Sequence, residues 1–381
     1  MDFSFTETQS MLRDTLRRYL AEAYDFDRRQ AMLASPARRD PGIWKALATE
    51  LGILGAPFAE QHGGFGGGPV DSMVIMEELG RAIACEPYLS TVVVGGRALE
   101  AAGGALADAL IPGIIAGEII IAFAWAERQA RYNMAHLRTR ASADGAGWTL
   151  SGEKAVVIAA PYATHYLVTA RTGGADDEAA GVSLFLVPAD APGIARRDYP
   201  TVDGHLAADI SFEKAKAGPQ ALVGAEGHAL PILEELFDRA VAATCAEAAG
   251  TMRRLHELTL DYARQRTQFG QPIGKFQVIQ HRLVDMFMEV EQAVSMTYMA
   301  TLKLGLPAAA RARAVSQAKA KIARGARFLG QSAVQIHGGI GITNELAAGH
   351  YFKRLTMLES AFGDADFHFG RIEQAISAEA A

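Results

Sequence analysis

The spacing of apolar residues changes twice along this chain, near Ile119 and again near Gly224. In the first and last segments, apolar residues recur every three or four positions, which is typical of amphipathic helices. In the middle segment, short runs of β-branched and aromatic residues alternate with turn residues, which predicts strands joined as hairpins. The sequence therefore predicts an α+β protein with a helical domain over 1–117, a β domain over 118–225 and a second helical domain over 226–381.

The ends of helices and strands can be placed within this outline. Thr6 and Gln9 have the pattern of a capping box, so a helix is expected to begin there. Further helices are expected over 43–54, 70–82, 89–102, 229–266, 275–304 and 308–337, with a last one through the C-terminal residues. Strands are expected over 119–125, 137–143, 148–150, 154–158, 166–171, 182–187 and 209–212. On the helix over 308–337, cations that include Arg311 and Lys319 are expected to form a solvated face.

Composition and charge exclude several classes of protein. The chain has 381 residues, 50% of them hydrophobic, which is enough for a large core. A net charge of -6 and a pI near 6.0 give no bulk attraction to nucleic acid or to an anionic membrane. Cys85 and Cys245 lack histidines at ligand spacing, so we expect no metal site and a cytoplasmic, reducing location. Residues 1–5 do not resemble a signal peptide, and charges and a proline interrupt the most apolar stretch, 105–126, so no membrane span is expected.

A run of glycines over 63–68 precedes an expected helix, as a phosphate-binding loop would. It lacks both the Lys-Ser/Thr pair of a P-loop and the preceding strand of a dinucleotide fingerprint, so we interpret it as a turn. The missing strand-helix-strand fingerprint also disfavours a nicotinamide-dependent dehydrogenase.

Two motifs in the last third of the chain point to a cofactor. Residues 266–277 read R-T-Q-F-G-Q-P-I-G-K-F-Q, and residues 335–341 read Q-I-H-G-G-I-G. Taken singly, Arg266 is a cation at a helix end and the glycines are a helix cap. Taken together, and after helical and β segments in this order, they resemble the R-x-x-F-G-x-x-I-x-x-x-Q and Q-x-x-G-G-x-G segments of acyl-CoA dehydrogenases.

That resemblance covers nearly the whole chain and implies FAD as cofactor, a β-barrel-like middle domain and a C-terminal four-helix bundle. The arginine fork suits a diphosphate, and glycine backbone lets the adenosine part approach closely. The resemblance assigns cofactor binding to Arg266, Gln268, Phe269, Gln277, Gln335, Gly338 and Gly339.

The catalytic base is where the chain departs from the family. Acyl-CoA dehydrogenases remove an α-proton with a carboxylate while the β-hydride passes to the flavin, and the usual glutamate is Phe362 here. Some relatives carry the base on an earlier helix, at the position of Asp238, and the following Arg239 then faces the acyl-CoA. The alternative for Asp238 is an ordinary ion-paired helix residue. Other acidic side chains near the usual position are weaker candidates: Glu359, Asp364 and Asp366.

The β domain departs from the family as well. The usual T-E-P-G-A-G-S-D reads A-E-R-Q-A-R-Y-N over 126–133, and the usual K-x-W-I-T reads K-A-V-V-I over 154–158. Val156 and Ile158 thus replace a tryptophan and a threonine that touch the flavin ring, and isoleucine cannot donate a hydrogen bond. Within the family this combination resembles the small subunit of bacterial pimeloyl-CoA dehydrogenases, whose relatives act on steroid side-chain acyl-CoAs beside a catalytic large subunit.

Two hypotheses follow from the resemblance. In the first, the chain is an enzyme of acyl-chain degradation that desaturates an acyl-CoA, with Asp238 as base and an electron-transfer flavoprotein to reoxidise the FAD. In the second, it is a non-catalytic partner that clamps the FAD of a neighbouring acyl-CoA dehydrogenase subunit. We expect a dimer of dimers, homomeric alone or heteromeric with such a partner. An oxygen-reducing oxidase is a third option, and pimeloyl, other dicarboxylyl and steroid-derived chains are all open as substrates.

Overall fold

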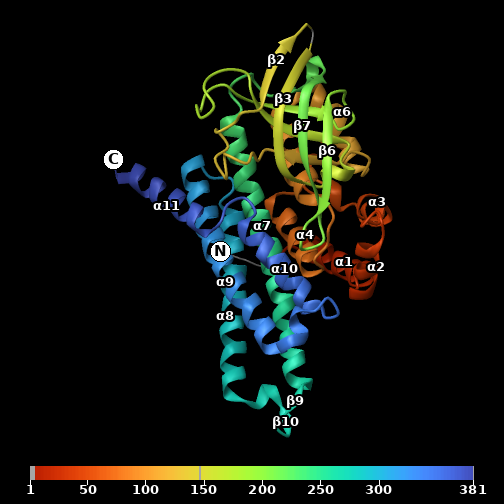
Figure 1. Cartoon of the computed structure of the whole chain (residues 1–381), viewed down its shortest axis with the longest axis vertical. Coiled ribbons are helices and arrows are strands. Elements are labelled where there is room, and N and C mark those ends of the chain that lie inside the picture. Colours follow the sequence, from red (N-terminus) through yellow and green to blue (C-terminus); the bar gives the residue numbers. More distant parts are fainter. Residues whose placement is uncertain (1–4, 146, 381) are drawn as a thin grey trace. The chain divides into compact units, whose positions relative to one another are not determined.

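A computed structural model describes residues 5–145 and 147–380 of the chain (Figure 1). The chain forms two compact units, each assembled from separate stretches of sequence. The sheet unit contains residues 38–68 and 85–240, and the helical unit contains residues 5–37, 69–84 and 241–380. The predicted boundaries of three consecutive domains stay a prediction, and residues 1–4, on which the signal-peptide expectation partly depends, lie outside the described part.

The sheet unit is built on one eight-stranded sheet of the described residues, in the order β6-β7-β3-β2-β4-β5-β8, with β1 paired in parallel to β4. Its strands are β1 (Ile121–Ala124), β2 (Arg140–Asp144), β3 (Gly147–Ile158), β4 (His165–Arg171), β5 (Val182–Pro188), β6 (Ile194–Pro200), β7 (Leu206–Ala217) and β8 (Leu222–Val223). Strand β3 covers two strands that the sequence predicted separately. Strand β6 was missed because its exposed, arginine-rich sequence has little apolar alternation.

Short helices complete the sheet unit: α3 (Pro41–Thr49), α5 (Arg97–Ala102), α6 (Gly104–Ile115) and a π-helix over Leu89–Gly96. The glycine run forms a turn after a 3₁₀ helix (Glu60–His62), as predicted. Gly64 is required there, because a Cβ would lie 2.2 Å from the carbonyl oxygen of Phe58.

The helical unit begins with the predicted capping box, in which Thr6 and Gln9 exchange side-chain to main-chain hydrogen bonds. Its central helix, α9, packs against α8, α10 and α11. The helices are α1 (Glu7–Ala23), α2 (Phe26–Ala34), α4 (Pro69–Arg81), α7 (Leu230–Gln265), α8 (Gln277–Leu302), α9 (Ala308–His337), α10 (Ala347–Ser360) and α11 (Ala365–Ala380). The sequence predicted one last helix through the C-terminal residues, whereas two helices, α10 and α11, follow α9 and are separated by residues 361–364. The first turns of α7 belong to the sheet unit and the rest to the helical unit.

The prediction of a solvated cationic face on α9 is wrong for Arg311 and Lys319, which are both buried. The Lys319 ammonium donates hydrogen bonds to the carbonyl oxygens of Leu358 and Glu359, at the C-terminal end of α10. Helix ends leave carbonyl groups without intrahelical partners, and a cation satisfies them there. Burial lowers the pKa of Lys319 to about 8. Periodicity could not reveal this contact, because it depends on a helix that follows much later in the chain.

His368 links α9 to the loop between α10 and α11. Its Nδ1 lies 3.1 Å from the Ser316 hydroxyl of α9, and its Nε2 lies 3.0 Å from the carbonyl oxygen of Phe362. Because that carbonyl oxygen only accepts, Nε2 carries the proton in the neutral ring. Burial, with the nearby charges of Lys319 and Arg371, lowers the pKa of His368 to about 3.

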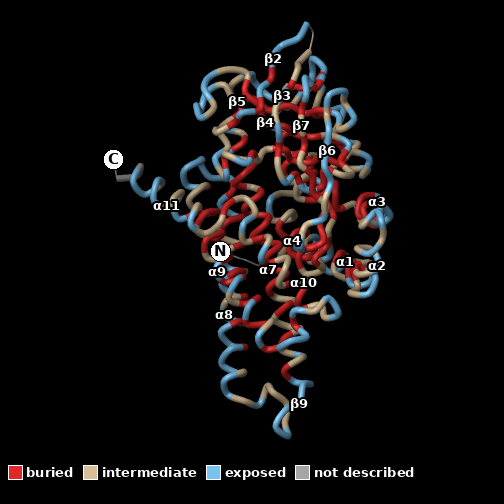
Figure 2. The backbone as a smooth tube through the Cα atoms, viewed as in Figure 1, coloured by how far each residue is buried: buried red, intermediate tan, exposed pale blue. Residues whose placement is uncertain are grey.

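No helix in the described part of the chain is both long enough and apolar enough to cross a membrane. Burial instead follows the sheet and the inner faces of the helices (Figure 2).

We predict that His368 makes the fold sensitive to acid. An unfolded histidine titrates near 6.5 and the folded one near 3, so stability is full above pH 6.5 and falls as the pH drops towards 3. The expected slope is at most about 1.4 kcal/mol per pH unit. Urea midpoints between about pH 7 and pH 4 should vary less in His368→Gln, whose amide does not titrate. The exposed His281→Gln is the control, and equal slopes in all three proteins would contradict the prediction.

Candidate functional site

The R-x-x-F-G motif forms a tight hairpin just after α7. Strands β9 (Thr267–Gln268) and β10 (Gln271–Pro272) pair across a two-residue turn in which Phe269 and Gly270 both have positive φ, 53° and 77°. Positive φ at both central positions is the geometry of the tightest hairpin turns. Phe269 is 92% exposed at the turn, and Arg266 and Gln268 are exposed as well. The backbone near β9 is accordingly coloured as exposed in Figure 2. The hairpin thus presents a cation, an amide and an aromatic ring to solvent.

The Q-x-x-G-G-x-G motif forms the end of α9. Gly338 follows the helix with φ 67°, and a Cβ added at Gly338 or Gly339 would meet no atom within 4 Å. Tyr262, near the end of α7, donates a hydrogen bond to the His337 carbonyl oxygen over 3.3 Å and packs against the His337 ring. This contact brings the two motifs together on the helical unit. Gln277, at the start of α8, and Gln335 are exposed there too.

This surface fits the phosphate and adenosine parts of FAD. A free guanidinium can donate two bonds to a diphosphate, and open glycine backbone permits close approach of a flat adenosine group. The exposed Phe269 ring, which packs edge-on against Phe276 with centroids 6.1 Å apart, offers an aromatic surface for such a ligand.

Asp238 and Arg239 lie on the first turns of α7, within the sheet unit. Asp238 is buried, at 1% exposure, and the neighbouring Phe237 ring packs edge-on against Trp125 at 5.7 Å. Arg239 donates to Glu235 over 2.9 Å, and a second arginine, Arg97, donates to the same carboxylate oxygen over 3.1 Å. Arg239 is therefore held by an ion pair within this unit.

The acidic residues near the usual base position have structural contacts in the helical unit. Asp364 accepts a hydrogen bond from the Phe367 amide over 2.9 Å and so begins α11, while Glu359 pairs with Arg327. Phe362 itself has φ 54°. None of the sequence-predicted residues in this loop region lies in the same unit as Asp238.

The wall that the resemblance assigns to the flavin ring lies on β3 in the sheet unit. Val156 is 52% exposed with φ 53°, and Ile158 is 36% exposed. Positive φ is rare for a β-branched residue and marks a strained position. Neither side chain, nor that of Ala126, carries a hydroxyl, so this wall does not fit the ring as the family's threonine and tryptophan do.

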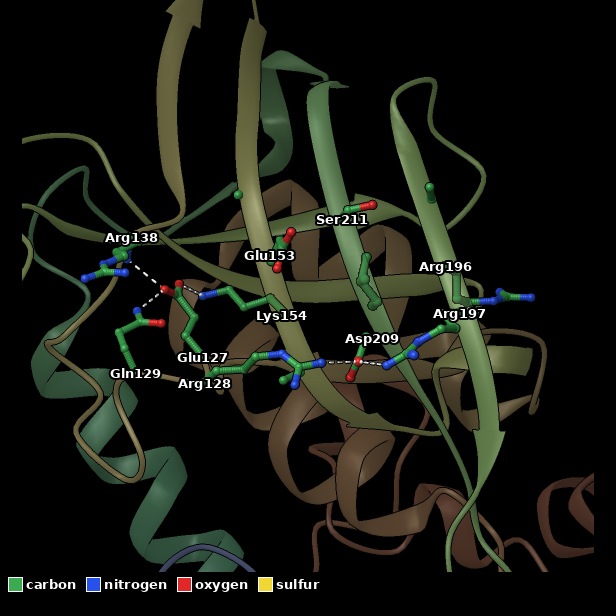
Figure 3. A pocket seen from close by; sticks show the side chains of 14 residues that line it. Glu127, Arg128, Gln129, Arg138, Glu153, Lys154, Arg196, Arg197, Asp209 and Ser211 are labelled. Atoms are coloured by element: carbon green, nitrogen blue, oxygen red, sulfur yellow. Dashed lines mark hydrogen bonds and ion pairs between the residues drawn. The ribbon is translucent and has the colours of Figure 1, made fainter.

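A buried ion pair anchors the loop that follows β1. Lys154 Nζ lies 2.7 Å from Glu127 Oε1, and the side chains are 0% and 4% exposed. Glu127 also accepts hydrogen bonds from the Gln129 side chain and the Arg138 amide (Figure 3). The Thr139 amide donates a further bond to Glu127. Burial acts to raise the pKa of Glu127, but Lys154 and these donors lower it to about 2. Burial lowers the pKa of Lys154 to about 8, so both groups are charged at neutral pH.

Asp209 on β7 is the centre of a second cluster, which sequence reasoning missed. Its Oδ2 accepts from Arg128 over 2.6 Å and from Arg197 over 2.8 Å (Figure 3). Its Oδ1 accepts from the Tyr199 hydroxyl over 2.9 Å. Partial burial acts to raise the pKa of Asp209, but hydrogen bonds from Arg197, the Val156 amide and Tyr199 lower it to about 2. The only signal in the sequence was an aspartate in a predicted strand. It did not reveal the cluster, because the arginines that contact this aspartate are not its neighbours in the sequence.

Comparison with known proteins gives three family matches in chain order. Residues 6–132 match the acyl-CoA dehydrogenase N-terminal domain, 122–215 the middle domain and 230–377 the C-terminal domain.

Among curated proteins, the acyl-CoA dehydrogenase FadE12 of Mycobacterium tuberculosis is 31% identical over 313 residues, which cover 80% of this chain and 79% of that protein. Among solved structures, the Tcur3481-Tcur3483 steroid ACAD variant is 30% identical with a TM-score of 0.88, covering 98% of this chain and 99% of that one. The ChsE4-ChsE5 complex from Mycobacterium tuberculosis is 26% identical with a TM-score of 0.89, covering 99% of both chains. The FAD complex of PigA, 25% identical with a TM-score of 0.90, covers 100% of both.

We predict that Lys154→Met destabilises the sheet unit by about 3–5 kcal/mol, because it leaves the Glu127 carboxylate buried without its cation. Lys216→Met is the matched control, since it removes a lysine from an exposed pair with Asp144 on the same sheet and should cost about 0–1 kcal/mol. Equilibrium unfolding in guanidinium compares the two. Equal losses of stability in the two variants would contradict the prediction that the buried pair contributes more than the exposed pair.

Proposed function

Because this chain belongs to the acyl-CoA dehydrogenase family, whose cofactor is FAD, we propose that it works as one subunit of a heteromeric acyl-CoA dehydrogenase. In this proposal the helical unit clamps the phosphate and adenosine parts of an FAD whose ring lies in the neighbouring subunit. The assembly desaturates an acyl-CoA between Cα and Cβ, and the bound FAD supplies the hydride acceptor.

The observation that carries this proposal is the exposure of every predicted cofactor-binding residue. Arg266 and Phe269 stand on the hairpin, Gly338 and Gly339 border open space, and all of them lie on the helical unit. The wall expected to hold the ring lies in the other unit and lacks its donors. A chain built in this way retains the residues for one half of a cofactor and has lost those for the other half.

The exposed face of α8 supports an oligomer. Val284, Phe287 and Met288 are 56%, 49% and 47% exposed and fall at helical spacing on one side of the helix. Apolar side chains grouped in this way are typical of a face that another subunit covers. We propose a cytoplasmic dimer of dimers, with the family's tetrameric form assembled from two unlike chains.

The similar structures support the choice of partner and substrate. One of them is a complex of two chains, ChsE4 and ChsE5, and the one that is 30% identical is a steroid ACAD. We therefore propose a second acyl-CoA dehydrogenase subunit as partner and a steroid-derived acyl-CoA as substrate, ahead of the pimeloyl chain that the sequence also suggested. Reoxidation by an electron-transfer flavoprotein belongs to the same proposal.

A second candidate function is that the chain is itself the enzyme, with Asp238 as base. The specific observation in its favour is that Asp238 is buried in the same unit as the β3 wall. Its carboxylate would take the α-proton, and Arg239 would face the acyl-CoA.

We predict that Arg266→Ala lowers the FAD content of the heteromer about tenfold or more, because a charge-assisted bond to phosphate contributes about 1.5–3 kcal/mol. Arg264→Ala is the control, since Arg264 is a cation at 68% exposure two residues earlier. Flavin released on denaturation gives the content, and native mass spectrometry of the same preparations gives the subunit composition. An unchanged FAD content in Arg266→Ala would contradict the proposal that this residue binds the FAD phosphates.

We predict that Asp238→Asn separates the two candidates, because an amide keeps the shape of the carboxylate but cannot take a proton. If the chain catalyses, turnover of the assembly falls by at least about a hundredfold while FAD binding is kept. If it is a partner subunit, turnover stays within about twofold of the unmodified assembly. Asp261→Asn, at an exposed position on the same helix, controls for the loss of a carboxylate.

A further inference from the structure

The β3 wall contains a β-bulge that Asp209 closes. In the ladder between β3 and β7, Lys154 pairs with Ile210 and Val157 pairs with Ala208, so two residues of β3 face the single residue Asp209. A bulge leaves one main-chain N–H without a ladder partner. Here that N–H belongs to Val156, and it donates to Asp209 Oδ1 over 3.1 Å. The aspartate therefore satisfies the one amide that the bulge exposes.

Both main-chain donors on this part of the wall are used within the chain. The Ala155 amide donates to the Ala126 carbonyl oxygen over 2.9 Å, and the Val156 amide donates to Asp209. A flavin ring presents carbonyl oxygens and ring nitrogens that need donors when they leave water. Ile158 has no hydroxyl to offer in place of the threonine. The wall thus has no free donor at positions 155 and 156 and none on the side chain at 158.

Two arginines complete the closure from opposite sides. Arg128 comes from the loop after β1 and reaches Asp209 across β3, while Arg197 comes from β6, directly opposite Asp209 in the ladder (Figure 3). Their side chains are 69% and 75% exposed, whereas that of Asp209 is 19% exposed. We call Arg128, Asp209, Arg197 and Tyr199 the Asp209 clamp. A flat aromatic ring laid on this wall would lie over the ion pair between Arg128 and Asp209, which crosses β3.

Space is not what excludes the ring. A pocket of about 730 Å³ lies beside the clamp, lined by Ala126, Val156 and the clamp residues among others. Its floor is an ionic network in which one carboxylate serves two guanidinium groups. Moving Arg128 aside would break its 2.6 Å charge-assisted bond to Asp209.

We infer that the sheet of this chain does not hold a flavin ring, because the Asp209 clamp occupies the wall that would have held it. The inference rests on the proposed function and deepens it. The chain carries only the phosphate and adenosine half of a cofactor site, so the heteromer contains one flavin for each pair of unlike subunits. The clamp keeps the bulged wall folded in the absence of a ring.

Riboflavin tests the inference, since it has the ring but neither diphosphate nor adenosine. Titrated into the purified chain and followed by quenching of its fluorescence, riboflavin should show no saturable binding. A restored variant, with Ala126→Thr, Val156→Trp, Ile158→Thr and Asp209→Ala, should gain binding about tenfold or more above background, because it regains a hydroxyl donor and an aromatic neighbour. Saturable binding by the unmodified chain would overturn the inference. So would a folded restored variant that gains nothing.

The clamp itself is tested without relying on the restored variant. In Asp209→Ala, amide hydrogen exchange at Val156 should become about tenfold faster or more, since its only acceptor is lost. Asp144→Ala, which removes a carboxylate elsewhere on the sheet, should leave that rate unchanged. Equal rates of amide exchange at Val156 in both variants would contradict the proposed role of the Asp209 clamp.

The two failures can be told apart. The proposed binding of the FAD phosphates is tested by the FAD content of Arg266→Ala. The riboflavin titration does not depend on that result, because riboflavin lacks every group that Arg266 would contact. Two flavins per pair of unlike subunits, with normal sensitivity to Arg266→Ala, would overturn this inference and leave the proposed function standing.

Discussion

The ion pair between Lys154 and Glu127 is the interaction on which the rest of the sheet unit's chemistry depends. The pair is almost fully buried, and the Glu127 carboxylate also accepts hydrogen bonds from the amides of Arg138 and Thr139. The pair therefore connects the loop after β1 to the middle of β3. A buried charge pair is stable only when its remaining hydrogen-bonding capacity is satisfied, and here it is. The next residue of this loop, Arg128, reaches Asp209 across β3 (Figure 3).

The helical unit follows a different rule. Its core is held by helix packing around α9 and by buried polar groups that satisfy helix ends, such as Lys319 at the end of α10. The residues that the family uses for FAD stay on its surface, on a hairpin and a glycine turn whose backbone is fixed by local geometry. Such a surface needs no partner in order to fold. It can therefore be kept for a neighbour's cofactor even where the chain's own ring wall has changed.

Much of the fold could be predicted from residues that lie close together in the sequence. The capping box at Thr6 and the long helices appear where their spacing predicts them, because these features depend on residues three or four apart. The misses have a common cause. Strand β6 is a largely exposed edge strand with two consecutive arginines, and the break at 361–364 depends on Asp364 capping α11. Propensity alone does not decide such positions, since contacts from other elements do.

The sequence by itself determined the family and the two cofactor motifs, because both are contiguous stretches whose residue types match their chemistry. It also showed that Val156 and Ile158 had replaced the ring contacts. Only the tertiary structure decided what stands in their place. Asp209, Arg128 and Arg197 are far apart in the chain, and they meet because a β-bulge exposes one amide and the sheet brings three strands and a loop to it. Burial and hydrogen bonding act between such distant residues, and no spacing along a sequence encodes them directly.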